Sequence, residues 1–212
     1  MKSQADACCE PVAGLHAILL AAGAATRFGA AKQLLPLDGV PLLRAMVSRA
    51  AEVVGNALVV VLGARAQELG ALLADTPARL VINADWSEGI GSSVRQGVAS
   101  LPAECGAALL LLADQAAITV QDLRELAAAW QRQPARIAAA GYDGTTGVPA
   151  IFPRACFPAL LRLRGDAGAR ALLRQHPERV LPVAMPRAAL DIDTPEDWRL
   201  FQESAAASSR IR

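Results

Sequence analysis

Short, continuously apolar segments recur along this chain and alternate with segments of helical periodicity. The clearest apolar runs are residues 16–22 (HAILLAA), 56–62 (NALVVVL) and 107–113 (AALLLLA). A strand with one face in water alternates apolar and polar side chains, whereas a strand covered on both faces does not. The pattern therefore predicts buried parallel strands separated by helices, which is an α/β fold.

The remaining elements complete this alternation. Further strands are expected at residues 79–83, 136–140, 148–152 and 180–183. Helices are expected at residues 41–54, 66–74, 92–101 and 120–133, and from Pro195 onward. Thr119 and Thr194 are good N-caps for the last two helices. Together these elements predict one doubly wound, mostly parallel sheet with helices on both faces over residues 15–203, after a loose leader (1–14) and before a frayed tail (204–212).

The composition excludes several classes of partner. Lys plus Arg number 21 and Asp plus Glu number 20, so the net charge of +1 offers no polybasic surface for nucleic acid or an anionic membrane. No apolar run approaches the roughly 20 residues that span a bilayer, and residues 1–14 lack the apolar centre of a secretory signal. The four cysteines include no CxxC pair, which argues against a zinc site or a disulfide framework. We expect a reduced, cytoplasmic protein.

Ligands of open α/β sheets bind beyond the carboxyl ends of the strands, here residues 23–32, 83–93, 114–117 and 142–149. The first of these loops is neither a Walker A loop, because five residues separate Gly23 from Gly29, nor a dinucleotide fingerprint, because Ala25 replaces its second glycine. Small residues nevertheless let backbone N–H groups approach phosphate, and Arg27 and Lys32 supply two cations. On spacing alone, a phosphate site and a loop with two solvated cations are equally open.

The full string L-A-A-G-x-x-x-R-F-G-x-x-K-x-L-L-P-L-x-G-x-P-L-L resembles the signature of nucleotidyltransferases that activate sugars and the molybdenum cofactor. The closest resemblance is to the molybdenum cofactor cytidylyltransferase branch. It extends from about residue 16 to 201 and continues through residues 89–93 (GIGSS), 112–115 (LADQ), 147–149 (GVP), 165–170 (GDAGAR) and 191–197 (DIDTPED). The resemblance implies a Rossmann-like nucleotidyltransferase fold.

The reaction implied by this resemblance is transfer of CMP from CTP to the terminal phosphate of molybdopterin, with Mg²⁺ as cofactor and pyrophosphate as leaving group. A molybdoenzyme is a possible recipient of the product. Arg27, Lys32 and Asp114 are the implied catalytic residues. Asp114 and Asp193 are the implied metal ligands, because Mg²⁺ prefers oxygen ligands, and Asp191 replaces Asp193 if the register is off by two.

The same resemblance divides the binding residues into two groups. Those implied for the nucleotide are Leu20, Ala21, Ala22, Gly23, Arg27, Lys32, Gly89, Ser92 and Ser93. Ala22 stands where the guanosine branch has glycine, which favours CTP, although Ser92 and Ser93 could equally cap the following helix. Those considered for the acceptor are Tyr142, Gly147, Pro149, Asp166 and Arg170.

Departures from the family pattern keep alternatives open. Ala25, Ala116 and Val148 replace residues common in the family, which motivates a non-catalytic protein that delivers cofactor to a molybdoenzyme. A guanylyltransferase or a sugar-phosphate nucleotidyltransferase of the same fold is a further alternative. An NAD(P)-dependent oxidoreductase is disfavoured because the dinucleotide fingerprint fails at Ala25.

Overall fold

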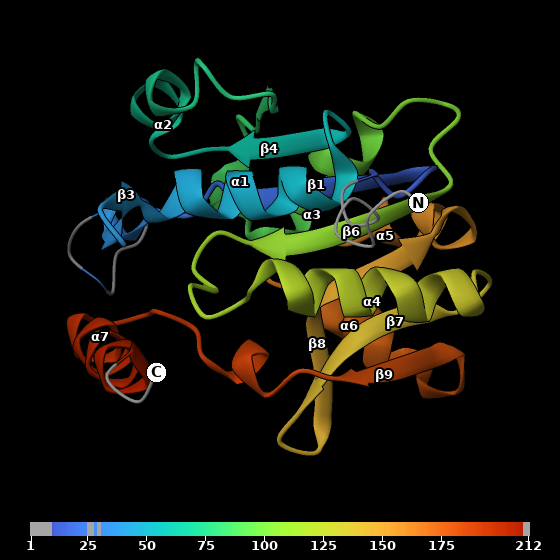
Figure 1. Cartoon of the computed structure of the whole chain (residues 1–212). Coiled ribbons are helices and arrows are strands. Elements are labelled where there is room, and N and C mark those ends of the chain that lie inside the picture. Colours follow the sequence, from blue (N-terminus) through green and yellow to red (C-terminus); the bar gives the residue numbers. More distant parts are fainter. Residues whose placement is uncertain (1–9, 25–27, 29–30, 210–212) are drawn as a thin grey trace, which may run out of the picture.

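A seven-stranded sheet forms the centre of the molecule, in the order β5-β4-β1-β6-β8-β7-β9. The computed structural model describes residues 10–24, 28 and 31–209 (Figure 1). The strands are β1 (Leu15–Ala21), β4 (Leu58–Leu62), β5 (Arg79–Ile82), β6 (Ala107–Leu112), β7 (Ile137–Tyr142), β8 (Thr145–Pro153) and β9 (Val180–Ala184). All neighbouring strands pair in parallel except at β8, which is antiparallel to β6 and β7. The predicted mostly parallel α/β sheet is confirmed.

Helices cover both faces of this sheet. They are α1 (Leu42–Val54), α2 (Ala66–Leu72), α3 (Ile90–Ala99), α4 (Val120–Arg132), α5 (Phe157–Leu160), α6 (Ala169–Gln175) and α7 (Pro195–Ser209). Figure 1 shows α1 and α4 in front of the sheet and α3, α5 and α6 behind it. Neighbouring residues of β1 serve the two layers separately: Leu19 belongs to the core on the α1 and α4 side, and Ile18 to the core on the α3 side. Because both faces are covered, the strand is apolar throughout.

Side-chain caps begin two of the helices where the sequence predicts them. The Thr119 side chain accepts from the backbone N–H of Asp122, whose carboxylate accepts from the Thr119 N–H, and these two bonds form a capping box at α4. Thr194 and Asp197 form the same reciprocal pair at α7, with Pro195 as its first residue. Helix α3 differs from the prediction. It begins at Ile90, two residues earlier than expected, and its N-cap is Gly89, which provides no side-chain hydrogen bond.

The two ends of the predicted domain contribute more structure than expected. The backbone N–H of Val12 donates to the carbonyl of Val53 at 3.0 Å, and Val12 packs against the core. Helix α7 continues through Ser209, six residues into the segment expected to be a tail. Within the described ranges, no helix is long and apolar enough to cross a membrane.

The strand order places a topological switch point at β1. Strand β1 pairs with β4 on one side and β6 on the other, so the chain winds outward in both directions from this position. At such a point the loops that leave neighbouring strands diverge and open a crevice at their carboxyl ends. The loops after β1 and β6 are therefore the expected walls of a ligand site.

Candidate functional site

A pocket of about 500 Å³ opens at the switch point, beyond the carboxyl ends of β1 and β6. It is lined by Leu20, Ala21, Ala22, Gly23, Ala24, Phe28, Lys32, Gln33, Trp86, Ser87, Gly89, Ile90, Ser93, Leu112, Ala113, Asp114 and Asp193. The structure thus brings together nine of the residues predicted to serve nucleotide or metal. Of those predictions, Ser92 does not line the pocket, and Arg27 lies outside the described residues, as does Ala25.

Three charged side chains from distant parts of the chain meet in this pocket. The Lys32 ammonium donates to Asp114 Oδ2 at 2.5 Å and to Asp193 Oδ1 at 3.0 Å. Lys32 begins the short turn after the first loop, Asp114 directly follows β6, and Asp193 precedes α7. The backbone N–H of Ile192 donates to the carbonyl of Asp114 at 3.2 Å, which keeps the two acidic segments side by side. The result is one cation shared between two carboxylates.

The local electrostatics follow from this crowding of charge. Burial alone lowers the pKa of Lys32, but the charges and hydrogen bonds of Asp114 and Asp193 outweigh it and raise the pKa above its ordinary value. Neighbouring Asp191 is exposed and does not line the pocket. Loss of hydration where it faces the protein, and then repulsion from Asp114 and Asp193, raise the pKa of Asp191 to about 6. Three carboxyl groups, those of Asp114, Asp191 and Asp193, therefore lie near one cation, Lys32.

The carboxylates of Asp114 and Asp193 fit a divalent cation. Asp114 Oδ1 is buried and has no hydrogen-bond partner, although a buried carboxylate oxygen without a partner is costly. Among the described residues no three His, Cys, Asp or Glu side chains group as a protein-only metal site. Mg²⁺ commonly binds through one or two carboxylates and takes its other ligands from phosphate and water. Asp114 and Asp193 could hold such an ion, whereas a closed structural metal site is not built there.

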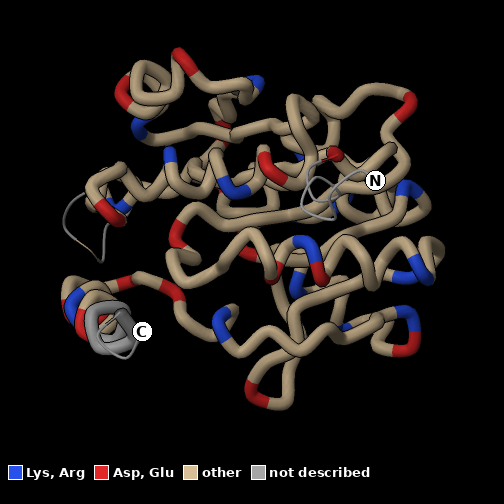
Figure 2. Tube along the Cα trace, in the orientation of Figure 1, with Lys and Arg blue, Asp and Glu red and all other residues tan. Residues whose placement is uncertain are grey.

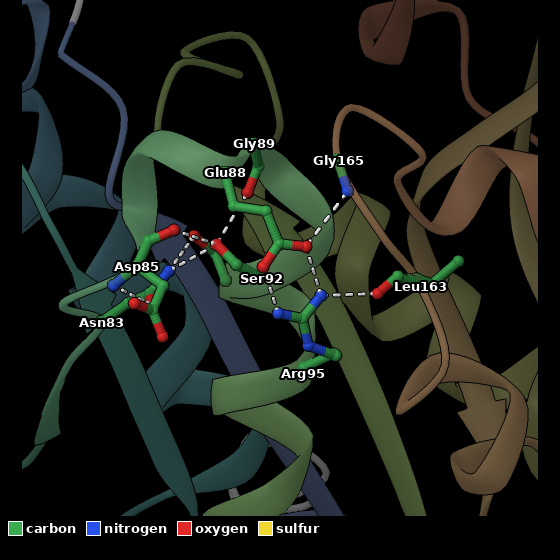
Figure 3. Close-up of polar contacts among 9 residues, drawn as sticks. Asn83, Asp85, Glu88, Gly89, Ser92, Arg95, Leu163 and Gly165 are labelled. Atoms are coloured by element: carbon green, nitrogen blue, oxygen red, sulfur yellow. Dashed lines mark hydrogen bonds and ion pairs between the residues drawn. The ribbon is translucent and has the colours of Figure 1, made fainter.

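A buried polar network supports the turn between β5 and α3, residues 83–89 (Figure 3). Asn83 is fully buried, and its amide nitrogen donates to Ser92 Oγ at 2.8 Å and Ser93 Oγ at 3.0 Å. The Ser92 hydroxyl is within hydrogen-bonding distance of the carbonyls of Asp85 and Gly89. Ser92 therefore braces the turn before α3, and Ser93 is the serine that reaches the pocket.

The five acceptor candidates do not form one cluster. The Arg170 guanidinium donates to the Tyr142 hydroxyl, and Gly147 lies against both groups, where a side chain would collide with the tyrosine. Pro149 is buried in β8 after a cis peptide bond with Val148. The carboxylate of Asp166 lies next to Gly89. None of the five lines the pocket.

Several pocket residues were not predicted from the sequence. Gln33 is buried and its amide donates to the Gly23 carbonyl at 3.3 Å, so it braces the first loop. Trp86 and Ile90 also line the pocket. Gln33 adjoins the cationic Lys32, and Trp86 and Ile90 fall within the loop 83–93 that the sequence identifies. Their position relative to the strand ends was the available signal.

Charge over the molecule is mixed. Figure 2 shows Lys and Arg interspersed with Asp and Glu along the trace. This agrees with the net charge of +1 and leaves the Lys32–Asp114–Asp193 cluster as a local feature of the pocket.

Comparison with known proteins identifies the family. Residues 17–180 match the family described as "MobA-like NTP transferase domain". The nicotine blue oxidoreductase of Paenarthrobacter nicotinovorans is 37% identical over 200 residues, covering 87% of this chain and 95% of the relative. The purine catabolism protein PucB of Bacillus subtilis is 32% identical, covering 90% and 97%. The molybdenum cofactor cytidylyltransferase of Escherichia coli K12 is 23% identical, covering 91% and 97%.

Solved structures agree with this relationship. A crystal structure of a manganese complex of Rv0371c from Mycobacterium tuberculosis H37Rv is 28% identical, with a TM-score of 0.73, covering 90% of this chain and 98% of that one. This chain belongs to the MobA-like nucleotidyltransferase family.

Proposed function

We propose that this chain transfers CMP from CTP to the terminal phosphate of a molybdenum-bearing pterin and releases pyrophosphate. The observation that carries the proposal is the Lys32–Asp114–Asp193 cluster in a pocket at the switch point of the sheet. One cation beside two carboxylates suits a triphosphate that arrives with a divalent metal ion. The E. coli relative named molybdenum cofactor cytidylyltransferase supports this choice of acceptor.

The proposed chemistry needs no covalent intermediate on the protein. An acceptor phosphate oxygen forms a bond to the α-phosphorus of CTP, and the bond from that phosphorus to the pyrophosphate oxygen breaks. Lys32 would orient the triphosphate and neutralise charge that grows on the leaving pyrophosphate. Asp114 and Asp193 would hold Mg²⁺, which supplies further charge neutralisation at the phosphates when bound. Arg27 is proposed as the second cation on the triphosphate.

The choice of base rests on the loops beside the phosphate site. Ala22 lines the pocket where the guanosine branch has glycine, and Ser93 presents a hydroxyl to the same space. Asn83 donates to Ser93 Oγ, so the serine hydrogen is available for a ligand acceptor such as a base carbonyl. The same pocket is also lined by Leu20, Ala21, Gly23 and Gly89. These features support a pyrimidine nucleotide.

We propose that the acceptor binds beside the Tyr142–Arg170 pair. Arg170 is exposed and donates a hydrogen bond to the Tyr142 hydroxyl, and its guanidinium is suited to bind a phosphate. Gly147 and Pro149 would shape this site, and Asp166 is the least supported of the five because it lies beside Gly89.

The test is pyrophosphate release from CTP and, separately, from GTP, with Mg²⁺ and the molybdenum-bearing pterin. We expect release with CTP that requires the pterin, and a fall in kcat of at least about 100-fold in Asp114→Ala, the scale at which one electrostatic group acts in a transition state. Release with GTP would retain the reaction and overturn the base assignment. Nucleotide binding without release would favour a cofactor-delivery protein, and release with a sugar phosphate but no pterin would change the acceptor.

A redox activity is the second candidate, and one observation favours it. The relative that is 37% identical over 200 residues carries the name nicotine blue oxidoreductase. A nicotinamide dinucleotide would have to occupy the same pocket, so it should compete with CTP. Oxidation of NADH or NADPH in the presence of an electron acceptor, together with such competition, would favour this candidate over nucleotidyl transfer.

A further inference from the structure

Two glycine-rich segments that are far apart in the sequence contact each other at the rim of the pocket (Figure 3). The N–H of Gly91 donates to the carbonyl of Gly165 at 2.9 Å. A Cβ atom added to Gly89 would lie 2.5 Å from the Gly165 carbonyl group, and one added to Gly91 would lie 3.0 Å from Gly165 O. The close approach of residues 163–168 thus requires glycine at position 89 and leaves little room for a side chain at position 91, independently of any ligand.

An ion pair fixes this contact from outside the pocket. Arg95 on α3 donates to both carboxylate oxygens of Glu88, at 2.8 and 2.5 Å, and to the carbonyl of Leu163 at 2.6 Å. The backbone N–H of Gly165 donates to Glu88 Oε1 at 3.2 Å. Glu88 and Arg95 therefore join three segments: the turn before α3, the helix itself and the loop after α5. We call these four hydrogen bonds the Glu88–Arg95 clamp.

The clamp acts on a backbone that faces the nucleotide pocket. Gly89 has φ +120°, a conformation that residues with side chains rarely adopt, and it lines the pocket with Ile90 and Ser93. None of residues 163–168 lines the pocket. Any influence of this loop on a nucleotide therefore passes through the residues it contacts, which are the Gly89 turn and the first turn of α3 with Ile90.

We propose that Glu88 and Arg95 are positioning residues for the nucleotide: they hold residues 163–168 against the Gly89 turn, so that the turn has its binding conformation before the nucleotide arrives. This inference rests on the proposed function of the pocket. It also gives the segment 165–170 a role toward the nucleotide, where the sequence suggested the acceptor. Preorganisation of this kind increases affinity because the ligand does not have to order the loop.

The first test compares Arg95→Met with Arg44→Met by titration with Mg-CTP and Mg-GTP. Arg44 is a matched control, since it bonds both oxygens of Asp75 at 2.5 and 2.9 Å and the carbonyl of Leu72 at 2.7 Å, away from the pocket. We expect Arg95→Met to weaken nucleotide binding about tenfold, the scale of ordering a short segment, and Arg44→Met to leave it unchanged. Equal affinity in both variants would overturn the inference alone. Failure of the unmodified chain to bind either nucleotide would overturn the proposed function, and this inference with it.

Two further readouts separate positioning from a general loss of stability. In Arg95→Met, amide exchange at residues 88–93 and 163–168 should be faster without ligand and slow again at saturating Mg-CTP. The KM for CTP should rise while kcat changes less, because a saturating nucleotide restores the turn. Glu88→Gln, which keeps an acceptor for Gly165, should show a smaller rise in KM than Arg95→Met. A fall in kcat with KM unchanged, or exchange that saturating Mg-CTP does not slow, would overturn the inference.

Discussion

Two aspartates separated by one residue have different environments, and this difference can be tested. Asp193 lines the pocket and accepts from Lys32, whereas Asp191 does neither. We predict that Asp193→Asn lowers kcat for pyrophosphate release about 10- to 100-fold, as loss of a metal-orienting contact commonly does. Asp191→Asn should stay within a few-fold of the unmodified chain, and only Asp193→Asn should need more Mg²⁺ to reach half its maximal rate. The reverse ranking would move the metal ligand to Asp191.

At this scale the sequence predicts residue chemistry better than residue geometry. Asp114 could be singled out because it is a charged residue at the end of an apolar strand. The sharing of Lys32 between two carboxylates could not be predicted, since Lys32 and Asp193 are 161 residues apart and only the folded sheet brings them together. Ser92 and Ser93 illustrate the same limit, because adjacent serines in one motif face a buried network and a pocket respectively.

At the scale of elements, helix α1 supports the loop that follows β6. Arg49 on α1 donates to the carbonyls of Ala116 and Ile118 at 2.8 and 2.7 Å, and burial lowers the pKa of Arg49. This loop begins directly after Asp114, so Arg49 ties the end of β6 that carries Asp114 to a helix. Arg49 thereby supplies a fixed point where the family commonly has proline and this chain has Ala116.

We predict that Arg49→Met lowers the free energy of unfolding by about 2 kcal/mol, the scale of losing charge-assisted hydrogen bonds to partly buried carbonyls. Urea unfolding followed by circular dichroism measures this change. Arg199→Met is the control, because Arg199 is exposed and its pairs with Glu196 and Glu203 lie within one helix, where solvent screens them and they contribute little to stability. Equal losses in the two variants would show that Arg49 contributes no more than a surface pair.

Most elements could be predicted from the apolar pattern, and the exceptions have physical reasons. Strand β8 is apolar like its neighbours but antiparallel to them, and burial on both faces leaves no trace of strand direction in the sequence. The small hairpin of β2 (Pro36–Leu37) and β3 (Val40–Pro41) was missed, although Asp38-Gly39 between them is a strong turn signal. Both of its turn residues have positive φ.

For the whole molecule, hydrogen bonds to surface carboxylates affect how the free energy of unfolding changes in acid. Within the part of the chain that the structure describes, four carboxylates have a pKa below the ordinary value: Glu88, Asp75, Glu196 and Asp197. In each case the largest cause is a hydrogen bond from a side chain. Glu88, Asp75 and Glu196 accept this bond from an arginine, and Asp197 accepts it from the Thr194 hydroxyl. For Glu88 the bonds from Arg95, then from Gly165, lower the pKa from 4.5 to about 2. Because the unfolded chain binds protons first, the stabilisation is complete above pH 4.5 and is lost as pH falls toward 2.

We therefore predict a melting temperature that rises slightly as the pH falls through about 6, where Asp191 takes up its proton in the folded chain, and that falls steeply below the ordinary carboxylate pKa of about 4. Glu88→Gln should lower it at neutral pH, and the difference from the unmodified chain should shrink as the pH approaches 2, where Glu88 becomes protonated in both folded and unfolded states. Asp75→Asn should converge in the same way but leave CTP affinity unchanged, which separates the stability of an ion pair from its effect on the pocket. Melting curves that stay parallel at every pH would mean that the Glu88 charge contributes nothing to folding, and that the clamp acts through its neutral hydrogen bonds alone.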